Sequence, residues 1–212
     1  MPQVSLETLI VGVRSGENLA SFPTDTVPAL AARPDCAGAI FAAKQRPANK
    51  SLILMAATAT DLWPFVVGSE AERNHWSEMA TRYWPGALTL VLPASDRVPA
   101  AMNPADPSTI GIRVPNSAIA QQVLAQTGPL ATTSVNRSGQ PPLTTASDIE
   151  ASFPDVLILA EASVNLMRAS TEPSLEVQAP SERPSTVIKW TGNRWEILRQ
   201  GTVEIGQPSK SG

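Results

Sequence analysis

Three basic residues stand close together where an expected helix ends and an expected strand begins. Lys44, Arg46 and Lys50 lie in the segment Lys-Gln-Arg-Pro-Ala-Asn-Lys, in which proline breaks the helix before the apolar run at 51–56. Lysine supplies a compact point charge, whereas arginine offers a planar fork that matches two phosphate oxygens. The cluster therefore predicts a site for a small polyanion. The alternative is that Lys44 and Arg46 only complement the carboxyl end of the helix, which is common.

The composition limits the class of partner. Sixteen Lys and Arg residues face nineteen Asp and Glu residues, which gives a net charge of −3 and a pI near 5.2. A local basic cluster on an acidic chain favours a small polyanion over a broad nucleic-acid surface. A single cysteine and a single histidine argue against a zinc site, so we expect no metal ligands on the protein.

The length and the hydropathy predict one globular protein. Its 212 residues are 42% hydrophobic and 17% charged, which is typical of a folded chain with a sizeable core. We expect one domain over 1–201 and a C-terminal tail over 202–212. No apolar run approaches bilayer length and the first residues do not read as a signal peptide, so we expect a cytoplasmic protein with no membrane partner.

Alternating helices and strands predict an α/β fold with a mixed sheet. Apolar residues at helical spacing indicate a helix that ends at Gly16, and Ser69 with Glu72 has the spacing of a capping box. Further helices are expected over 36–43, 117–126 and from Thr145 onward. Residues 98–109 are expected to be a mobile loop and 161–184 a polar connection. The expected strands are 19–22, 51–56, 87–92, 110–114, 130–134, 156–160, 186–190 and 194–199, the last two joined in a hairpin.

Polar turns fall at the ends of these strands, where open α/β sheets usually bind ligands. Each turn alone is ordinary, but together they bring cations, hydroxyls and an amide and no evident general base. Such a set suits a site that positions and neutralises phosphates. The P-loop, dinucleotide-binding and nucleophile-elbow motifs do not occur in the sequence. The turns are 24–26, 44–50, 109–113, 132–138, and Ser185 with Arg199.

Six motifs together resemble the YrdC-like family, in order and spacing, from about Leu6 to Gly201. They are Phe-Pro-Thr-Asp-Thr-Val at 22–27, Lys-Gln-Arg-Pro-x-x-Lys at 44–50, Trp-Pro-Gly-x-Leu-Thr-Leu at 84–90, Ile-Arg-Val-Pro at 112–115, Pro-Leu-Ala-x-Thr-Ser-x-Asn-x-Ser-Gly at 129–139, and Pro-Ser-Thr-Val at 184–187 with a late Leu-Arg-x-Gly. The resemblance implies a twisted α/β sheet around a large, positively lined cavity. It also implies a threonylcarbamoyl-AMP synthase, which joins L-threonine, bicarbonate and ATP and releases pyrophosphate.

The resemblance implies two sets of site residues and several partners. Lys44, Arg46, Ser134 and Asn136 are the expected catalytic residues. The expected ATP contacts are Lys44, Arg46, Lys50, Thr109, Ser134, Asn136 and Arg199. The expected threonine contacts are Thr26, Arg113, Thr132 and Ser185, with Arg113 facing the carboxylate. Mg²⁺ is expected on the ATP phosphates. The product would pass to the tRNA threonylcarbamoyl-transfer machinery that modifies adenosine 37, and RNA or tRNA is a further expected partner.

Four departures from the family pattern keep two alternatives open. Pro28-Ala29-Leu30-Ala31 replaces the usual Tyr-Gly-Leu-Gly, Met55 stands where many members have histidine, Val135 replaces alanine, and Glu182-Arg183-Pro184 replaces a glycine-rich segment. Losing both glycines removes backbone freedom near the amino-acid side. One alternative is a paralogue that binds nucleotide or RNA without synthase activity. The other is an adenylate-forming enzyme with a different amino-acid or carbamoyl substrate.

Overall fold

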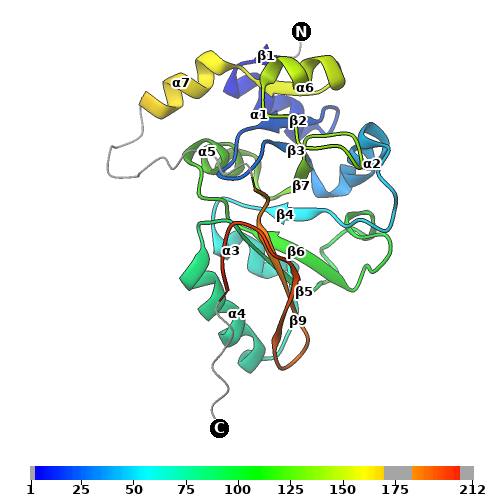
Figure 1. The fold of residues 1–212 in the computed structure, drawn as a ribbon, viewed down its shortest axis with the longest axis vertical. Coiled ribbons are helices and arrows are strands. Elements are labelled where there is room, and N and C mark those ends of the chain that lie inside the picture. Colours follow the sequence, from blue (N-terminus) through cyan, green and yellow to red (C-terminus); the bar gives the residue numbers. More distant parts are fainter. Residues whose placement is uncertain (1–2, 170–182, 206–212) are drawn as a thin grey trace.

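The computed structural model describes residues 3–169 and 183–205 and folds them around one mixed sheet of ten strands (Figure 1). The strand order is β1-β8-β2-β3-β7-β4-β6-β5-β9-β10. The strands are β1 (Gln3–Val4), β2 (Ala20–Phe22), β3 (Ala29–Ala32), β4 (Ile53–Met55), β5 (Leu88–Pro93), β6 (Thr109–Arg113), β7 (Leu130–Ser134), β8 (Leu157–Leu159), β9 (Thr186–Trp190) and β10 (Trp195–Arg199). The helices are α1 (Leu6–Ser15), α2 (Ala37–Lys44), α3 (Ala59–Leu62), α4 (Glu70–Tyr83), α5 (Ala118–Thr127), α6 (Ala146–Ser152) and α7 (Glu161–Ala169).

Local sequence signals begin and end the helices as expected. The Ser69 hydroxyl accepts a hydrogen bond from the backbone N–H of Glu72, and the Glu72 carboxylate accepts one from the backbone N–H of Ser69, so the capping box of α4 is confirmed. Gly16 ends α1 at a φ of 80°, a conformation that suits glycine. The closing hairpin is also confirmed, because β9 and β10 pair antiparallel.

The mixed sheet is confirmed by its pairing directions. β4 runs parallel to β6 and β5 runs parallel to β9, whereas β7 lies antiparallel to both β3 and β4. Alternate side chains of each strand point to opposite faces of the sheet. One face packs against α2, α3, α4 and α6 through a core that includes Leu54, Leu90 and Ile112.

The second face is covered by helices over only part of its width. There α1, α5 and α7 pack on a smaller core that includes Phe22, Leu130 and Leu159. Figure 1 shows these helices gathered at one end of the molecule, with the β9–β10 hairpin at a distance from them. The strands between β7 and β9 therefore keep a stretch of this face without a helix over it.

Two segments differ from the sequence-based expectation. Residues 29–32 were not among the expected strands, but they form β3, which pairs with β2 on one side and with β7 on the other. Residues 161–169 form α7 rather than a polar connection, since Val164 and Met167, three residues apart, are buried against the smaller core. Residues 170–182 of that expected connection lie outside the described residues.

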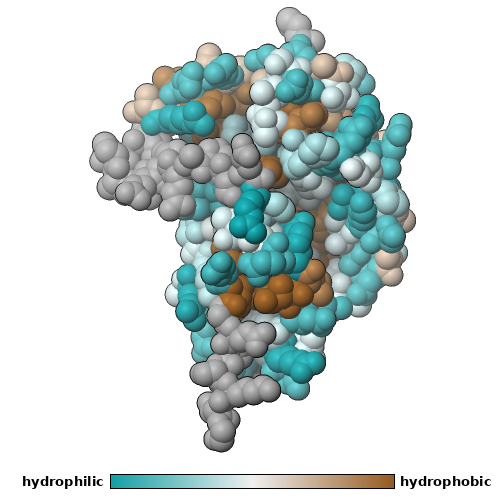
Figure 2. Space-filling model, in the orientation of Figure 1, coloured by the Kyte–Doolittle hydropathy of each residue, from teal (hydrophilic) through white to brown (hydrophobic). Residues whose placement is uncertain are grey.

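The remaining expectations concern a loop, the tail and the surface. The loop 98–109 contains a 3₁₀ turn at Ala100–Met102, and Met102 is buried in the main core. In the expected tail, Val203 donates its backbone N–H to the Thr186 hydroxyl, and residues 206–212 lie outside the described part. Figure 2 shows a hydrophobic patch over the β9–β10 hairpin, where Ile197 and Leu198 are exposed. No helix in the described part of the chain is long and apolar enough to cross a membrane.

Candidate active site

A cavity of about 580 Å³ lies on the part of the sheet that none of the described helices covers. It is lined by every predicted site residue except Lys44 and Thr109. Those in its lining are Thr26, Arg46, Lys50, Arg113, Thr132, Ser134, Asn136, Ser185 and Arg199. Residues from both halves of the sequence therefore meet in one site.

The floor of the cavity follows from strand alternation. Ile53, Gly111 and Thr132 are neighbours across β4, β6 and β7, and all three line the cavity. Their sequence neighbours Leu54, Ile110 and Ile112 point to the opposite face and are buried in the main core. A Cβ added to Gly111 would lie 3.3 Å from Thr89 Cγ2, so glycine keeps the centre of the floor low.

One side of the cavity, here called the basic end, carries Arg46 and Lys50. Arg46 is held by the loop it belongs to, donating from Nε to the Lys50 carbonyl at 3.1 Å and from Nη2 to the Ser51 carbonyl at 2.7 Å. Within residues 3–169 and 183–205, neither cation has a carboxylate at ion-pair distance. The basic end thus carries unbalanced positive charge, which suits a polyanion.

Lys44 lies behind the basic end rather than in the cavity lining. Its side chain is 1% exposed, and its Nζ donates to the Ser134 carbonyl and, at 2.9 Å, to Asn136 Oδ1. Burial, reinforced by the charges of Arg46 and Lys50, lowers the pKa of Lys44 to about 7. The structure therefore places Lys44 where it orients Asn136.

Asn136 clamps the loop that forms the wall beside Ser134. Its Nδ2 donates to the carbonyls of Arg137 and Gln140 at 2.8 Å and 2.7 Å, while its Oδ1 accepts from Lys44 and from the Ser134 hydroxyl. Both amide protons are thereby used, and so is the hydroxyl proton of Ser134. In this structure these two residues shape the basic end, and the free cationic N–H groups around it are those of Arg46 and Lys50.

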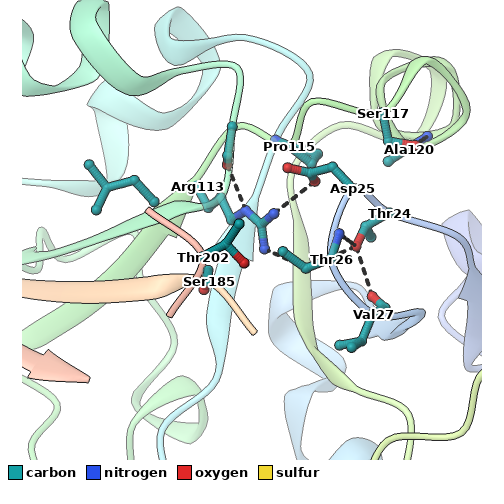
Figure 3. Close-up of polar contacts among 12 residues, drawn as sticks. Thr24, Asp25, Thr26, Val27, Arg113, Pro115, Ser117, Ala120, Ser185 and Thr202 are labelled. Atoms are coloured by element: carbon teal, nitrogen blue, oxygen red, sulfur yellow. Dashed lines mark hydrogen bonds and ion pairs between the residues drawn. The ribbon is translucent and has the colours of Figure 1, made fainter. Parts of the chain in front are cut away.

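The other side of the cavity, here called the paired end, is built around Arg113 (Figure 3). Its Nη2 lies 2.7 Å from Asp25 Oδ1, its Nη1 donates to Thr26 Oγ1 at 3.0 Å, and its Nε donates to the Gly86 carbonyl at 2.9 Å. The side chains of Arg113 and Asp25 are only 2% and 9% exposed. Burial lowers the pKa of Arg113, while the Asp25 carboxylate acts in the opposite direction.

Thr26 can only accept a hydrogen bond from a ligand. The Thr24 hydroxyl donates to the Val27 carbonyl at 2.8 Å, and it lies 3.2 Å from Thr26 Oγ1. Since the Thr24 proton is used, Thr26 must donate to Thr24 and accept from Arg113. The Thr132 hydroxyl likewise donates to the Ile53 carbonyl at 3.0 Å. Both hydroxyls therefore offer acceptor lone pairs to an ammonium or hydroxyl group.

The last two strands complete the paired end. Arg199 donates to the Ser185 carbonyl and hydroxyl, and Ser185 Oγ lies 2.9 Å from the Thr89 hydroxyl. Burial and the nearby charge of Arg113 lower the pKa of Arg199. Arg199 therefore belongs to the paired end in this structure, whereas the sequence-based expectation assigned it to ATP.

Thr109 is not brought into the cavity. Its hydroxyl contacts the Asp106 carboxylate at 3.1 Å and accepts from Asn103 Nδ2 at 3.1 Å. Conversely, Asp25, Thr89 and Gly111 contribute to the site without having been expected. The signal for Gly111 was present in the alternation of β6, Thr-Ile-Gly-Ile-Arg, where small and polar residues share one face. Asp25 lies in the expected polar turn 24–26, but its pairing with Arg113 could not be foreseen, because the two residues are 88 positions apart.

The sequence comparisons place the chain among known proteins. The profile of the Sua5–YciO–YrdC family, described as telomere recombination, matches residues 13–201. The chain is 34% identical over 203 residues to a protein of Vibrio parahaemolyticus named threonylcarbamoyl-AMP synthase, covering 93% of this chain and 99% of that protein. A protein of Vibrio campbellii with the same name is 33% identical over 158 residues, covering 73% of this chain and 84% of the relative.

Solved structures show the same fold. P. abyssi Sua5 complexed with L-threonine superposes with a TM-score of 0.75 at 28% identity, and the match covers 92% of this chain and 54% of that one. The chain thus spans about half of that protein. E. coli YciO superposes with a TM-score of 0.73 at 21% identity, and the match covers 94% of this chain and 90% of YciO. At this identity the likeness shows the fold alone. By its profile match and its relatives, the chain belongs to the Sua5/YciO/YrdC family.

Proposed function

We propose that the protein is a threonylcarbamoyl-AMP synthase, which converts L-threonine, bicarbonate and ATP into L-threonylcarbamoyladenylate, pyrophosphate and water. One observation carries the proposal: one cavity joins a basic end, which has no carboxylate partner among the described residues, to a paired end with one arginine fork and hydroxyl acceptors. The first suits a triphosphate and the second suits an amino acid. The names of the relatives point to the same reaction.

The chemistry requires positioning more than proton transfer. Carboxylation of the threonine nitrogen by bicarbonate, with loss of water, yields a carbamate, whose oxygen attacks the α-phosphorus of ATP as the bond to pyrophosphate breaks. Arg46 and Lys50 would bind the phosphates and stabilise the charge that develops on them. Arg113 would bind the threonine carboxylate, and Thr26 and Thr132 would accept hydrogen bonds from its N–H and hydroxyl groups. The carbamate is already anionic, so the step needs no general base.

Magnesium would enter with the nucleotide. In residues 3–169 and 183–205, no group of three or more His, Cys, Asp and Glu side chains could hold a metal ion. Asp25, the carboxylate of the paired end, is engaged by Arg113. The phosphate oxygens are therefore the fitting ligands, and a bound Mg²⁺ would neutralise part of their charge. The product would be consumed by a separate transferase that carries the threonylcarbamoyl group to tRNA.

The test is product formation followed by liquid chromatography and mass spectrometry. The complete mixture should yield a threonylcarbamoyladenylate peak, and the peak should vanish when threonine or bicarbonate is omitted. Labelled bicarbonate should appear in the product, which separates carbamoylation from an ordinary aminoacyl adenylate. ATP binding without any adenylate would instead support a paralogue that binds nucleotide or RNA without synthase activity. An affinity for RNA that falls steeply with salt concentration would identify an RNA-binding paralogue.

A different amino-acid substrate is the second candidate, because the wall of the cavity departs from the family pattern. Met55 and Ala29 both line the cavity, at positions where the family usually has other residues. Met55 is the parallel neighbour of Arg113 across β4 and β6, so its flexible side chain borders the paired end. Profiling all standard amino acids in the same assay separates the two candidates: turnover highest with threonine supports the synthase, and a preference for another amino acid supports the second.

A further inference from the structure

We propose that Asp25 is a positioning residue that reserves the paired end for the single carboxylate of an amino acid and keeps phosphate groups out of it. The inference rests on the proposed function in naming threonine as the ligand, but its charge argument stands on the contacts of Arg113. Asp25 does not line the cavity and therefore acts through Arg113 rather than on the substrate.

The first step of the argument is geometric. An arginine side chain has five N–H bonds, and three of those of Arg113 are directed to Asp25, Thr26 and the Gly86 carbonyl. One N–H remains on each terminal nitrogen, which matches in number the two oxygens of a carboxylate. Asp25 and Thr26 are adjacent in one turn, so the same turn fixes the fork and presents a hydrogen-bond acceptor beside it (Figure 3).

The second step is electrostatic and compares the two ends. Burial lowers the pKa of Lys44 most, and the charges of Arg46 and Lys50 lower it further, which indicates that these cations repel one another. No carboxylate in the described part of the chain pairs with Arg46 or Lys50. At the paired end, the Asp25 carboxylate offsets one of the two arginines, leaving Arg199 as the unbalanced charge. One net positive charge suits the single carboxylate of an amino acid, whereas a phosphate dianion prefers the two unpaired cations of the basic end.

The third step follows from removing the carboxylate. An amide in place of Asp25 would leave Arg113 and Arg199 as two neighbouring cations without an acidic partner in the described part of the chain. Two such groups make a second phosphate site. Pyrophosphate or free phosphate could then bind the paired end and compete with threonine. Asp25 thus determines that the paired end binds the amino acid and the basic end binds the phosphates.

The experiment compares Asp25→Asn with a matched surface control, Asp35→Asn. Asp35 also pairs with an arginine, Arg33, but both side chains are largely exposed. Initial rates of adenylate formation are measured against threonine and against ATP, with and without inorganic phosphate. Asp25→Asn should raise KM for threonine about tenfold to a hundredfold, the usual effect of losing a hydrogen bond between charged groups. Phosphate should become competitive with threonine, and KM for ATP should stay within about threefold.

A merely structural role predicts a different pattern. It would lower activity towards both substrates together and leave phosphate without a competitive effect, and that result would overturn the proposal. Asp25→Glu serves as the second variant: it keeps the charge but displaces the fork, so threonine affinity should fall while phosphate stays excluded. If Asp25→Asn does not fold, competition by phosphate in Asp25→Glu decides, and its appearance would overturn the proposal.

Direct binding separates this proposal from the proposed function. Calorimetric titration of the unmodified protein with inorganic phosphate, without ATP, should show one site, and Asp25→Asn should show a second. This readout does not depend on turnover. If the unmodified protein makes no adenylate but the variant gains the second phosphate site, the synthase assignment fails and the role of Asp25 stands. Equal phosphate binding in both proteins would remove the role of Asp25 even for an active synthase.

Discussion

The two ends of the cavity differ in whether their positive charges are paired with a carboxylate. At the basic end, Arg46 and Lys50 lie half-buried or exposed beside backbone carbonyls, and no described carboxylate pairs with them. At the paired end, Arg113 is buried, bound by Asp25, and connected through Thr26 and Thr24 to the Val27 carbonyl. Arg46 and Lys50 are therefore available to bind an anionic ligand, whereas the contacts of Arg113 help to hold the fold together.

Because of this difference, the basic end should contribute mainly to ligand binding, whereas the paired end should also contribute to the stability of the fold. A partly buried cation without a partner lowers the free energy of unfolding, and a bound anionic ligand raises it again. A buried ion pair behaves otherwise, because removing one member leaves the other charge uncompensated. Mutations at the basic end should therefore act on nucleotide use, and mutations at the paired end should act on folding as well.

The largest effect is expected from Arg113→Ala. This change leaves the Asp25 carboxylate buried without its partner, which typically costs about 3–5 kcal/mol in the free energy of unfolding. Urea unfolding followed by circular dichroism measures it. The control is Arg33→Ala, which breaks an exposed Arg–Asp pair and should cost at most about 1 kcal/mol. Similar losses in the two variants would contradict the distinction between buried and exposed pairs.

Arg46→Ala should come next and should spare the fold. Removing one phosphate contact that strengthens in the transition state costs about 2–4 kcal/mol, so adenylate formation should slow by roughly two to three decades. Unfolding in urea should be nearly unchanged, because Arg46 bonds only to carbonyls of its own loop. Arg194→Ala, at the exposed tip of the closing hairpin, is the control. Full activity in Arg46→Ala would refute the assignment of phosphates to the basic end.

Burial of Lys44 should make the free energy of unfolding depend on pH, an effect of intermediate size. Its pKa is about 7 in the folded protein, against 10.5 ordinarily, so between these values the unfolded chain binds more protons. The free energy of unfolding should then rise with pH by up to about 1.4 kcal/mol per unit across this window. Below pH 7 the penalty of burying the charge is fully present. Lys44→Met should abolish this slope, and parallel pH profiles for the two proteins would exclude the lowered pKa.

The smallest effect is expected from Thr109→Val. Its hydroxyl is engaged by Asp106 and Asn103 outside the cavity, so KM for ATP and the rate of adenylate formation should stay within about threefold of the unmodified protein. The same initial-rate assay measures both quantities. A loss comparable to that of Arg46→Ala would show that Thr109 contacts the nucleotide.

Local rules predicted much of the fold. Helix starts followed from capping patterns such as Ser69 with Glu72, and strands followed from apolar runs, because each depends on residues a few positions apart. β3 was missed because Ala-Leu-Ala-Ala has neither alternation nor β-branched residues, and pairing with two neighbouring strands overrides its helical preference. α7 was missed because its buried face consists of only Val164 and Met167.

The site was predictable as a set of residue types but not as an arrangement. The motifs named nearly all of the polar residues that line the cavity, since each lies in its own short segment. Their division into two ends depends on sheet register and on contacts across long sequence separations, such as that between Asp25 and Arg113. For the same reason the contact of Arg199 with Ser185 and that of Lys44 with Asn136 could not be predicted, and the expected contacts of Arg199 and Lys44 with ATP stay predictions.

The pairing of β5 with β9 has a consequence for how the protein is made. Leu88 lies beside Thr186 although 98 positions separate them, and Gly201 packs so closely on Pro184 and Ser185 that a Cβ there would overlap the backbone. On the ribosome, β5 therefore emerges long before the strand that covers its edge. The cavity acquires Ser185 and Arg199 only when the last strands have been synthesised, so the paired end is the last part of the site that a nascent chain can complete.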